Sequence, residues 1–152
     1  MKITIIGPGA IGLLIASSLE DLNDVSMLVK KKHYDKLNKN GLWIKKGENK
    51  SKINAKIITE VEDPEIVIIA VKSYDLQITK KILRTFKGKI IICQNGLKML
   101  DYNPENSNDV LAIVTSVGAV SLELGITEFM GTGNTVIGNL NGTGHGTWNL
   151  EN

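Results

Sequence analysis

Residues 2–12 read Lys-Ile-Thr-Ile-Ile-Gly-Pro-Gly-Ala-Ile-Gly, and this stretch determines the expected fold. The apolar run 3–6 is too short for a helix and too apolar for an edge strand, so it predicts a buried parallel strand. The glycines that follow have the spacing Gly7-x-Gly9-x-x-Gly12. Gly7 permits a tight turn, Gly9 lets the backbone approach a phosphate, and Gly12 lets a following helix pack closely. The stretch predicts a dinucleotide site, with an ordinary structural turn as the alternative.

The residues after this turn predict a helix whose N-terminus faces the phosphates. Free N–H groups and the positive end of the helix dipole attract anions at such a position. Glu20 and Asp21 come late in the segment. We therefore expect an amphipathic helix whose inward side chains are Ile11, Leu14, Leu19 and Leu22.

The composition is that of an ordinary globular protein and argues against several function classes. The chain has 152 residues, of which 42% are hydrophobic and 22% charged, and this suits one domain with one sizeable core. A net charge of +2 is too small to favour nucleic acid or an anionic membrane as a partner. No apolar run approaches the ~20 residues of a membrane span, and no signal peptide is recognisable. We therefore expect neither nucleic acid nor membrane as a partner.

Cysteine and histidine offer little for disulfide or metal chemistry. Cys93 is the single cysteine, so no internal disulfide forms and a cytoplasmic location is expected. It ends the apolar run Ile90-Ile91-Ile92-Cys93, which favours a core position over a nucleophile. The sequence has no histidine pair at ligand spacing and no cysteine cluster, so we expect no metal site.

Apolar strands and helices alternate along the rest of the chain. Strands are expected at 25–29, 66–71, 89–93 and 110–114. A helix is expected at 75–86, with apolar residues 78, 82, 83 and 86 on its buried face.

Two further segments predict smaller β-structures. Leu42, Ile44, Ile53, Ala55 and Ile57 alternate with polar residues around a Gly-Glu-Asn turn and predict a small hairpin. From residue 118 onward, β-branched segments separated by glycines predict an antiparallel meander. The fold class is therefore α/β: a Rossmann-type, doubly wound, mainly parallel sheet with an appended hairpin and a C-terminal meander. Residues 1–140 would form this domain, and 141–152 a flexible, glycine-rich tail.

The end of the second strand indicates which nicotinamide cofactor is preferred. NAD-selective sites usually carry a carboxylate there for the ribose hydroxyls. This chain has Val29-Lys30-Lys31-Lys32-His33 instead, which offers cations to a 2′-phosphate and therefore favours NADP(H). Lys30 is the best single candidate, and a solvated basic helix start is the alternative. His33 is interpreted as an exposed residue at that helix start.

Several motifs together resemble one family. They are the opening 1–12, the strand end Ala-Val-Lys-Ser-Tyr-Asp at 70–75, Cys-Gln-Asn-Gly at 93–96, Thr-Ser-Val-Gly-Ala at 115–119 and Gly-Asn-Thr-Val-Ile-Gly at 133–138. The Gly-Leu-Trp-Ile segment at 41–44 is similar as well. In this order they resemble the N-terminal domain of ketopantoate reductase (2-dehydropantoate 2-reductase) over nearly the whole chain.

The resemblance implies an activity and a set of site residues. Members of the family reduce ketopantoate, a 2-oxo acid, to pantoate with NADPH, a step toward pantothenate and coenzyme A. By matching position, the cofactor residues are Gly7, Pro8, Gly9, Ala10, Ile11, Gly12, Lys30, Lys72, Asn95 and Ala119.

Three strand-end residues also carry an argument of their own. Lys72 follows a buried strand, where a cation can meet a ribose, a phosphate or a substrate carboxylate; an exposed strand-end lysine is the alternative. Asn95 follows the next strand, and its amide can bridge the nicotinamide ribose and a polar group of the substrate. Asn-Gly is also a plain turn signal. For Asp75, capping of the following helix is the favoured role.

The resemblance also implies a helical C-terminal domain, which supplies the catalytic lysine and most substrate contacts in the family. Residues 1–152 contain no counterpart of this domain. Reduction of a carbonyl needs a positioned acid, and we find no candidate in the sequence. His145 lies in the expected flexible tail. The chain is therefore interpreted as the cofactor-binding part of a reductase, inactive alone.

The alternative is a free-standing NADP-binding or redox-sensing module that acts through a partner. Without the second domain we also expect an exposed apolar face, and with it a tendency to form homo-oligomers.

Overall fold

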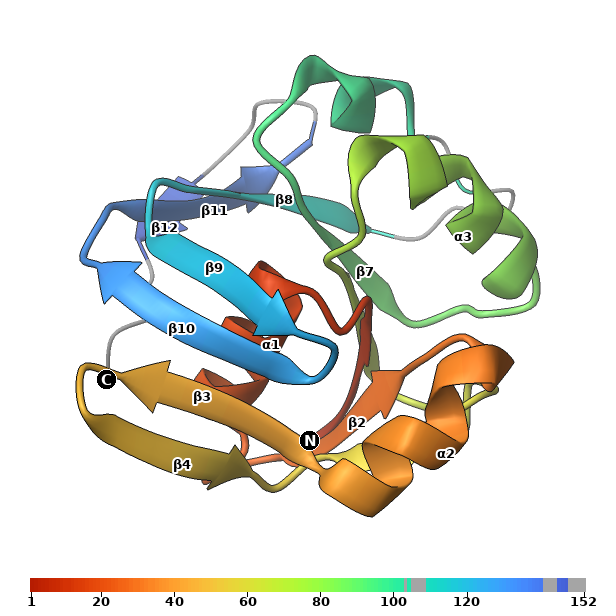
Figure 1. Ribbon diagram of the computed structural model, residues 1–152. Coiled ribbons are helices and arrows are strands. Elements are labelled where there is room, and N and C mark those ends of the chain that lie inside the picture. The colour runs from red at the N-terminus through yellow and green to blue at the C-terminus, as the bar shows by residue number, and fades with distance from the viewer. Residues whose placement is uncertain (103, 105–108, 141–144, 148–152) are drawn as a thin grey trace.

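The computed structural model describes residues 1–102, 104, 109–140 and 145–147, and these form two sheets with a helix between them (Figure 1). The larger sheet has eight strands in the order β12-β11-β8-β7-β6-β1-β2-β5. From β5 to β8 neighbouring strands are parallel, and β11 and β12 add antiparallel pairs at one edge. Its strands are β1 (Lys2–Ile6), β2 (Asp24–Leu28), β5 (Lys56–Ile58), β6 (Ile66–Ile69), β7 (Lys89–Cys93), β8 (Val110–Thr115), β11 (Thr135–Asn139) and β12 (His145–Thr147).

This sheet confirms the predicted α/β, Rossmann-type class. The expected strand 89–93 is reproduced as β7, and the expected 66–71 is shorter, ending at Ile69. The interpretation of 141–152 as a flexible tail is wrong for β12, because residues 145–147 pair with β11. The rest of that segment lies outside the described residues.

The second sheet corrects the predicted hairpin and meander. It has the order β4-β3-β10-β9, with β3 (Leu42–Lys46), β4 (Asn49–Ile53), β9 (Gly118–Glu123) and β10 (Ile126–Gly131). The hairpin exists as β3 and β4, but β3 pairs in parallel with β10 and not with the main sheet. Ile57 belongs to β5 instead. The meander is likewise divided, because β9 and β10 lie in this sheet while β11 joins β8.

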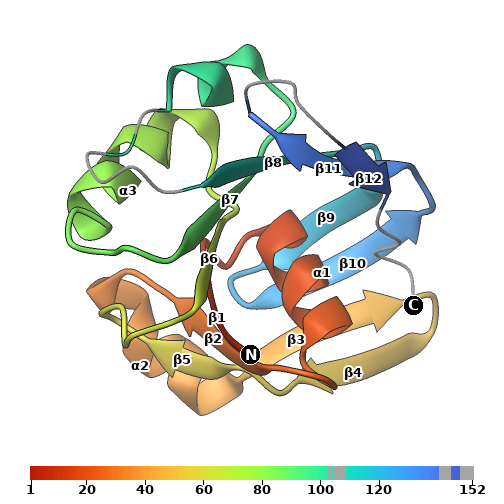
Figure 2. The same ribbon diagram turned by 180° about the vertical axis from the view of Figure 1, so that it is seen from behind.

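Helix α1 (Ala10–Leu19) lies between the two sheets and contacts strands of both (Figure 2). Residues 12–16 are all buried, so the helix is not amphipathic, contrary to the prediction. The second sheet covers the face that would otherwise meet solvent, and an apolar surface all round is what such a helix requires. The helix ends at Leu19, so Leu22 lies outside it and is 89% exposed, contrary to its expected inward position.

The remaining helices flank the sheet ends. They are α2 (Lys31–Asn40), α3 (Leu76–Ile82) and two 3-10 turns, η1 (Ser73–Asp75) and η2 (Leu97–Asp101). The predicted apolar face of 75–86 is partly wrong, because Leu76, Thr79 and Leu83 are buried while Ile78 and Ile82 are exposed.

Strand alternation divides the core into two clusters. Ile5 and Ile68 point toward α1, whereas Ile6, Val67 and Ile69 belong to the cluster that includes Leu76 of α3. Successive side chains of a strand point to opposite faces, so a strand buried on both faces must be apolar throughout. The continuous Ile and Val runs of β1, β6 and β7 follow from this requirement.

The turn from β1 into α1 needs glycine at two positions. Gly7 has φ +111°, and a side chain there would place Cβ 2.9 Å from the carbonyl oxygen of Ala70. A Cβ at Gly12 would overlap the carbonyl oxygen of Gly7. At Gly9, by contrast, no atom lies within 4 Å of a built Cβ, and φ is −85°. The glycine spacing therefore serves a close backbone approach at 7 and 12 and leaves open space at 9.

Gly12→Ala should lower the free energy of unfolding by about 1–3 kcal/mol, because the added methyl group overlaps backbone that cannot easily move. This loss exceeds the ~1 kcal/mol by which alanine normally favours a helix over glycine. Gly9→Ala, the matched control, should change stability by no more than about 1 kcal/mol. Urea denaturation measures both, and equal midpoints for the two variants would contradict the close contact at Gly12.

Leu14→Ala should destabilise the protein by about 2–5 kcal/mol, because Leu14 is fully buried between the sheets. Leu22→Ala removes an exposed side chain and should stay within about 0.5 kcal/mol of the wild type. Thermal denaturation compares them. A large effect of Leu22→Ala would indicate instead that the helix extends to Leu22 and buries its side chain, as expected from the sequence.

Candidate functional site

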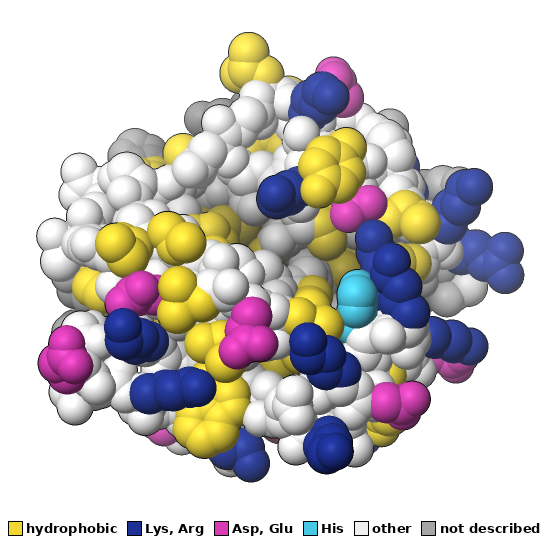
Figure 3. All heavy atoms as spheres, viewed as in Figure 1, with side chains coloured by type: hydrophobic (Ala, Val, Ile, Leu, Met, Phe, Trp, Pro, Cys, Tyr) yellow, Lys and Arg dark blue, Asp and Glu magenta, His cyan; other side chains and the backbone are white. Residues whose placement is uncertain are grey.

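A pocket opens at the carboxyl ends of β1, β2 and β6, where a parallel α/β sheet places its ligands. Its volume is about 410 Å³. The space-filling view shows a hollow near the middle of this face, with lysines and a histidine around it (Figure 3). The pocket is lined by the glycine turn, the residues after β2 and β6, and one side of α3.

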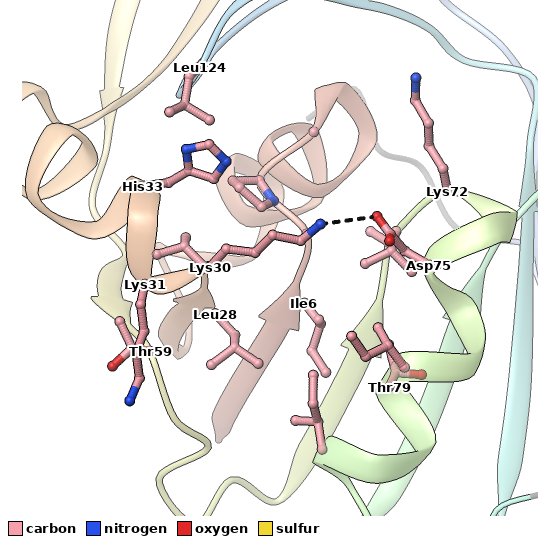
Figure 4. A pocket seen from close by; sticks show the side chains of 18 of the residues that line it. Ile6, Leu28, Lys30, Lys31, His33, Thr59, Lys72, Asp75, Thr79 and Leu124 are labelled. Atoms are coloured by element: carbon pink, nitrogen blue, oxygen red, sulfur yellow. Dashed lines mark ion pairs between the residues drawn. The ribbon is translucent and has the colours of Figure 1, made fainter.

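The inner wall of the pocket is apolar. Ile6 and Leu28 contribute from the strands (Figure 4). Ile78 and Ile82 contribute from α3. The exposure of Ile78 and Ile82, 52% and 41%, is therefore explained by their position in the pocket wall. An apolar pocket wall of this kind suits a flat aromatic group such as a purine ring.

The glycine turn forms the side of the pocket next to α1. Gly7, Pro8 and Gly9 line it. Gly9 is the N-cap of α1, and a glycine has no side chain that could cap this helix end. The first backbone N–H groups of α1 are thus available to an anion, and the helix dipole favours negative charge there.

Lys30 stands where β2 ends and α2 begins, and its side chain crosses the pocket (Figure 4). Its Nζ lies 3.6 Å from Oδ2 of Asp75, which comes from the start of α3. Lys31 also lines the pocket and pairs with Glu60 at 3.6 Å. Lys32 is exposed and is not part of the lining.

His33 and Asp75 differ from the sequence expectations. His33 is half-buried rather than exposed, and it forms part of the pocket wall beside Leu124 (Figure 4). Asp75 occupies the N-cap position of α3, but its carboxylate makes no capping hydrogen bond. The predicted capping role is wrong, because the side chain turns toward Lys30 instead.

Lys72 and Asn95, the two expected substrate-binding side chains, have different surroundings. Lys72 is exposed, lines the pocket and extends away from the Lys30–Asp75 pair (Figure 4). Asn95 holds the end of β8, where the chain turns toward β9: its Nδ2 donates to the carbonyl oxygen of Thr115 at 2.6 Å, and its Oδ1 accepts from the Thr115 N–H at 3.1 Å. The Thr115 and Thr135 hydroxyl oxygens are 2.7 Å apart, which links this turn to β11.

The pocket therefore brings together about half of the expected site residues. Gly7, Pro8, Gly9, Lys30 and Lys72 line it, whereas Ala10, Ile11, Gly12, Asn95 and Ala119 do not. Ala10, Ile11 and Gly12 belong to α1. Ala119 is half-buried in β9 and packs against the core.

Cys93 occupies the core position that the sequence predicts. It is buried, and burial raises the pKa of its thiol to about 12, so the thiol stays protonated at neutral pH and is a poor nucleophile. Within the described residues, no cluster of three or more His, Cys, Asp or Glu side chains could hold a metal ion. In the same part of the chain, no helix is both long and apolar enough to cross a membrane.

Comparison with known proteins places the chain in a family. The pattern of "Ketopantoate reductase PanE/ApbA" matches residues 3–142. A 2-dehydropantoate 2-reductase of Pyrococcus horikoshii is 34% identical over 145 residues, which cover 91% of this chain and 47% of that protein.

Solved structures show the same fold. A PanE/ApbA family ketopantoate reductase from Ralstonia eutropha superposes with a TM-score of 0.79 at 22% identity, covering 90% of this chain and 49% of that one. D-mandelate dehydrogenase with NADH and anilino(oxo)acetate gives 0.77 at 21% identity, covering 94% and 50%. The chain thus spans about half the length of the relatives that it matches. It belongs to the ketopantoate reductase PanE/ApbA family and corresponds to the N-terminal half of its members.

Proposed function

We propose that this chain is the NADP(H)-binding domain of a 2-dehydropantoate 2-reductase, an enzyme that reduces ketopantoate to pantoate on the route to pantothenate and coenzyme A. One observation carries the proposal. The uncapped start of α1 and the cationic end of β2 open onto the same pocket, so one extended dinucleotide can meet both. The family membership supports the reaction class.

The residues present fit such a cofactor. The glycine turn and the α1 N-terminus would hold the pyrophosphate, since a ligand can approach Gly9 without meeting a side chain. The apolar wall of Ile78 and Ile82 would take the adenine, and Lys30 the 2′-phosphate. The bound nicotinamide supplies a hydride to the carbonyl carbon of the substrate.

Lys72 and Asn95 would serve the nicotinamide and substrate end. The Lys72 ammonium is exposed at the pocket rim, where it can attract the carboxylate of a 2-oxo acid. The Asn95 amide is held in place by Thr115 but keeps a second N–H and a second lone pair for a ribose or a substrate oxygen. Ala119 and the α1 residues 10–12 remain cofactor positions implied by the family match.

We infer that this chain binds the cofactor but needs further groups for catalysis. Carbonyl reduction requires an acid aimed at the developing alkoxide. The lysines that line the described pocket, Lys30, Lys31 and Lys72, are exposed, so packing does not hold an ammonium group in one position against a bound substrate. For the alternative of a redox-sensing module, the buried thiol of Cys93 gives no support.

The triple variant Lys30→Ala, Lys31→Ala, Lys32→Ala should bind NADPH at least about tenfold more weakly, because charge-assisted contacts to the 2′-phosphate are worth about 1.5–3 kcal/mol. NADH lacks this phosphate, so its affinity should hardly change. Isothermal titration calorimetry at low ionic strength measures both. The control is Lys39→Ala, Lys50→Ala, Lys52→Ala, which removes three exposed charges outside the pocket. Equal losses for both cofactors in the first variant would refute the assigned role of the basic run.

The isolated chain should not oxidise NADPH when ketopantoate is added, although it binds the cofactor. Absorbance at 340 nm follows the reaction, and calorimetry on the same sample verifies binding. Appreciable turnover would show that residues 1–152 contain a complete catalytic site.

A further inference from the structure

The single carboxylate among the described residues that line the pocket is Asp75. It faces Lys30 across the pocket at 3.6 Å, and the two side chains are 33% and 62% exposed (Figure 4). They come from different parts of the chain, the N-cap position of α3 and the end of β2. The cation expected to meet a 2′-phosphate is thus already paired with an acid.

We propose that Asp75 is a specificity-determining residue that weakens the preference of this site for NADPH over NADH. The inference rests on the proposed function, because it needs a nicotinamide dinucleotide in the pocket. Lys30 draws the 2′-phosphate in, Asp75 opposes it, and the balance between them sets the cofactor preference.

The opposition follows from the geometry in two ways. If Lys30 keeps its position, a phosphate oxygen about 2.8 Å from Nζ lies at most about 6.4 Å from Oδ2 of Asp75, well within the screening length at physiological salt. If Lys30 instead turns toward the phosphate, it gives up its ion pair with Asp75. Both routes reduce the net gain from binding the phosphate, and neither applies to NADH.

Asp75 is free of the structural role that its position suggests. Its carboxylate makes no hydrogen bond to the start of α3, so replacing it leaves no donor of that helix end newly unpaired. Asparagine has the same shape, removes the charge and can donate a hydrogen bond to a phosphate. Asp75→Asn therefore removes the charge at nearly constant shape.

Glu60 provides a matched control. It also lies 3.6 Å from a lysine of the basic run, Lys31, but it is 79% exposed and does not line the pocket. Glu60→Gln removes the same charge from a similar pair at a position where it should not meet the cofactor.

The experiment measures dissociation constants of the full 152-residue chain and its two variants for NADPH and for NADH by calorimetry. Asp75→Asn should raise the NADPH affinity roughly three- to fivefold, which corresponds to the energy of an exposed ion pair. The NADH affinity should change less than twofold, and Glu60→Gln should change neither. The NADPH gain should shrink at high salt. Melting temperatures verify that each variant is folded.

Two results would overturn the inference while leaving the proposed function intact. An equal loss for both cofactors would mean that Asp75 holds a part that they share, such as the adenine or its ribose. An unchanged or lower NADPH affinity at unchanged NADH affinity would mean that the carboxylate does not oppose the phosphate. If the wild-type chain bound neither cofactor at millimolar concentration, both the inference and the proposed function would fail.

Discussion

The structure depends on one close contact, that between the start of α1 and the turn that precedes it. Gly7 bends the chain with φ +111°, and Gly12 leaves no side chain between the helix and the Gly7 carbonyl. This contact allows α1 to enter the space between the two sheets, where residues 12–16 are buried on all sides. It also directs the uncapped helix end toward the pocket. Stability and the proposed anion-binding site therefore have the same origin.

Local pattern was sufficient for the strands β1, β2, β6, β7 and β8 of the main sheet, but not for its members β5, β11 and β12. The strands β1, β6 and β7 are continuous apolar runs, which a sheet covered on both faces requires. The pairing of β3 with β10 joins residues more than eighty positions apart, and no local signal marks it. The second sheet, which the sequence does not predict, also explains why α1 is not amphipathic. At Ile78 and Ile82 the helical period was read correctly, but these side chains line a pocket rather than the core.

The lining of the pocket was predictable where one segment builds it and not where several segments meet. The glycine turn and Lys30 were recognised because strand, turn and helix follow one another in the sequence. Asp75 was expected to cap its own helix, since sequence shows only its neighbours along the chain. The fold brings it to Lys30 instead, 45 positions earlier. His33 and Leu124 likewise became pocket residues through packing that sequence does not display.

The most direct test of this account is a titration of ¹⁵N-labelled chain with NADP⁺, followed by two-dimensional amide spectra. The account predicts that the largest shifts occur at Gly7, Gly9, Lys30 and Lys72, with little change in β4, which belongs to the second sheet and does not line the pocket. Shifts centred on the second sheet, or none at millimolar cofactor, would contradict the claim that this pocket binds a nicotinamide dinucleotide.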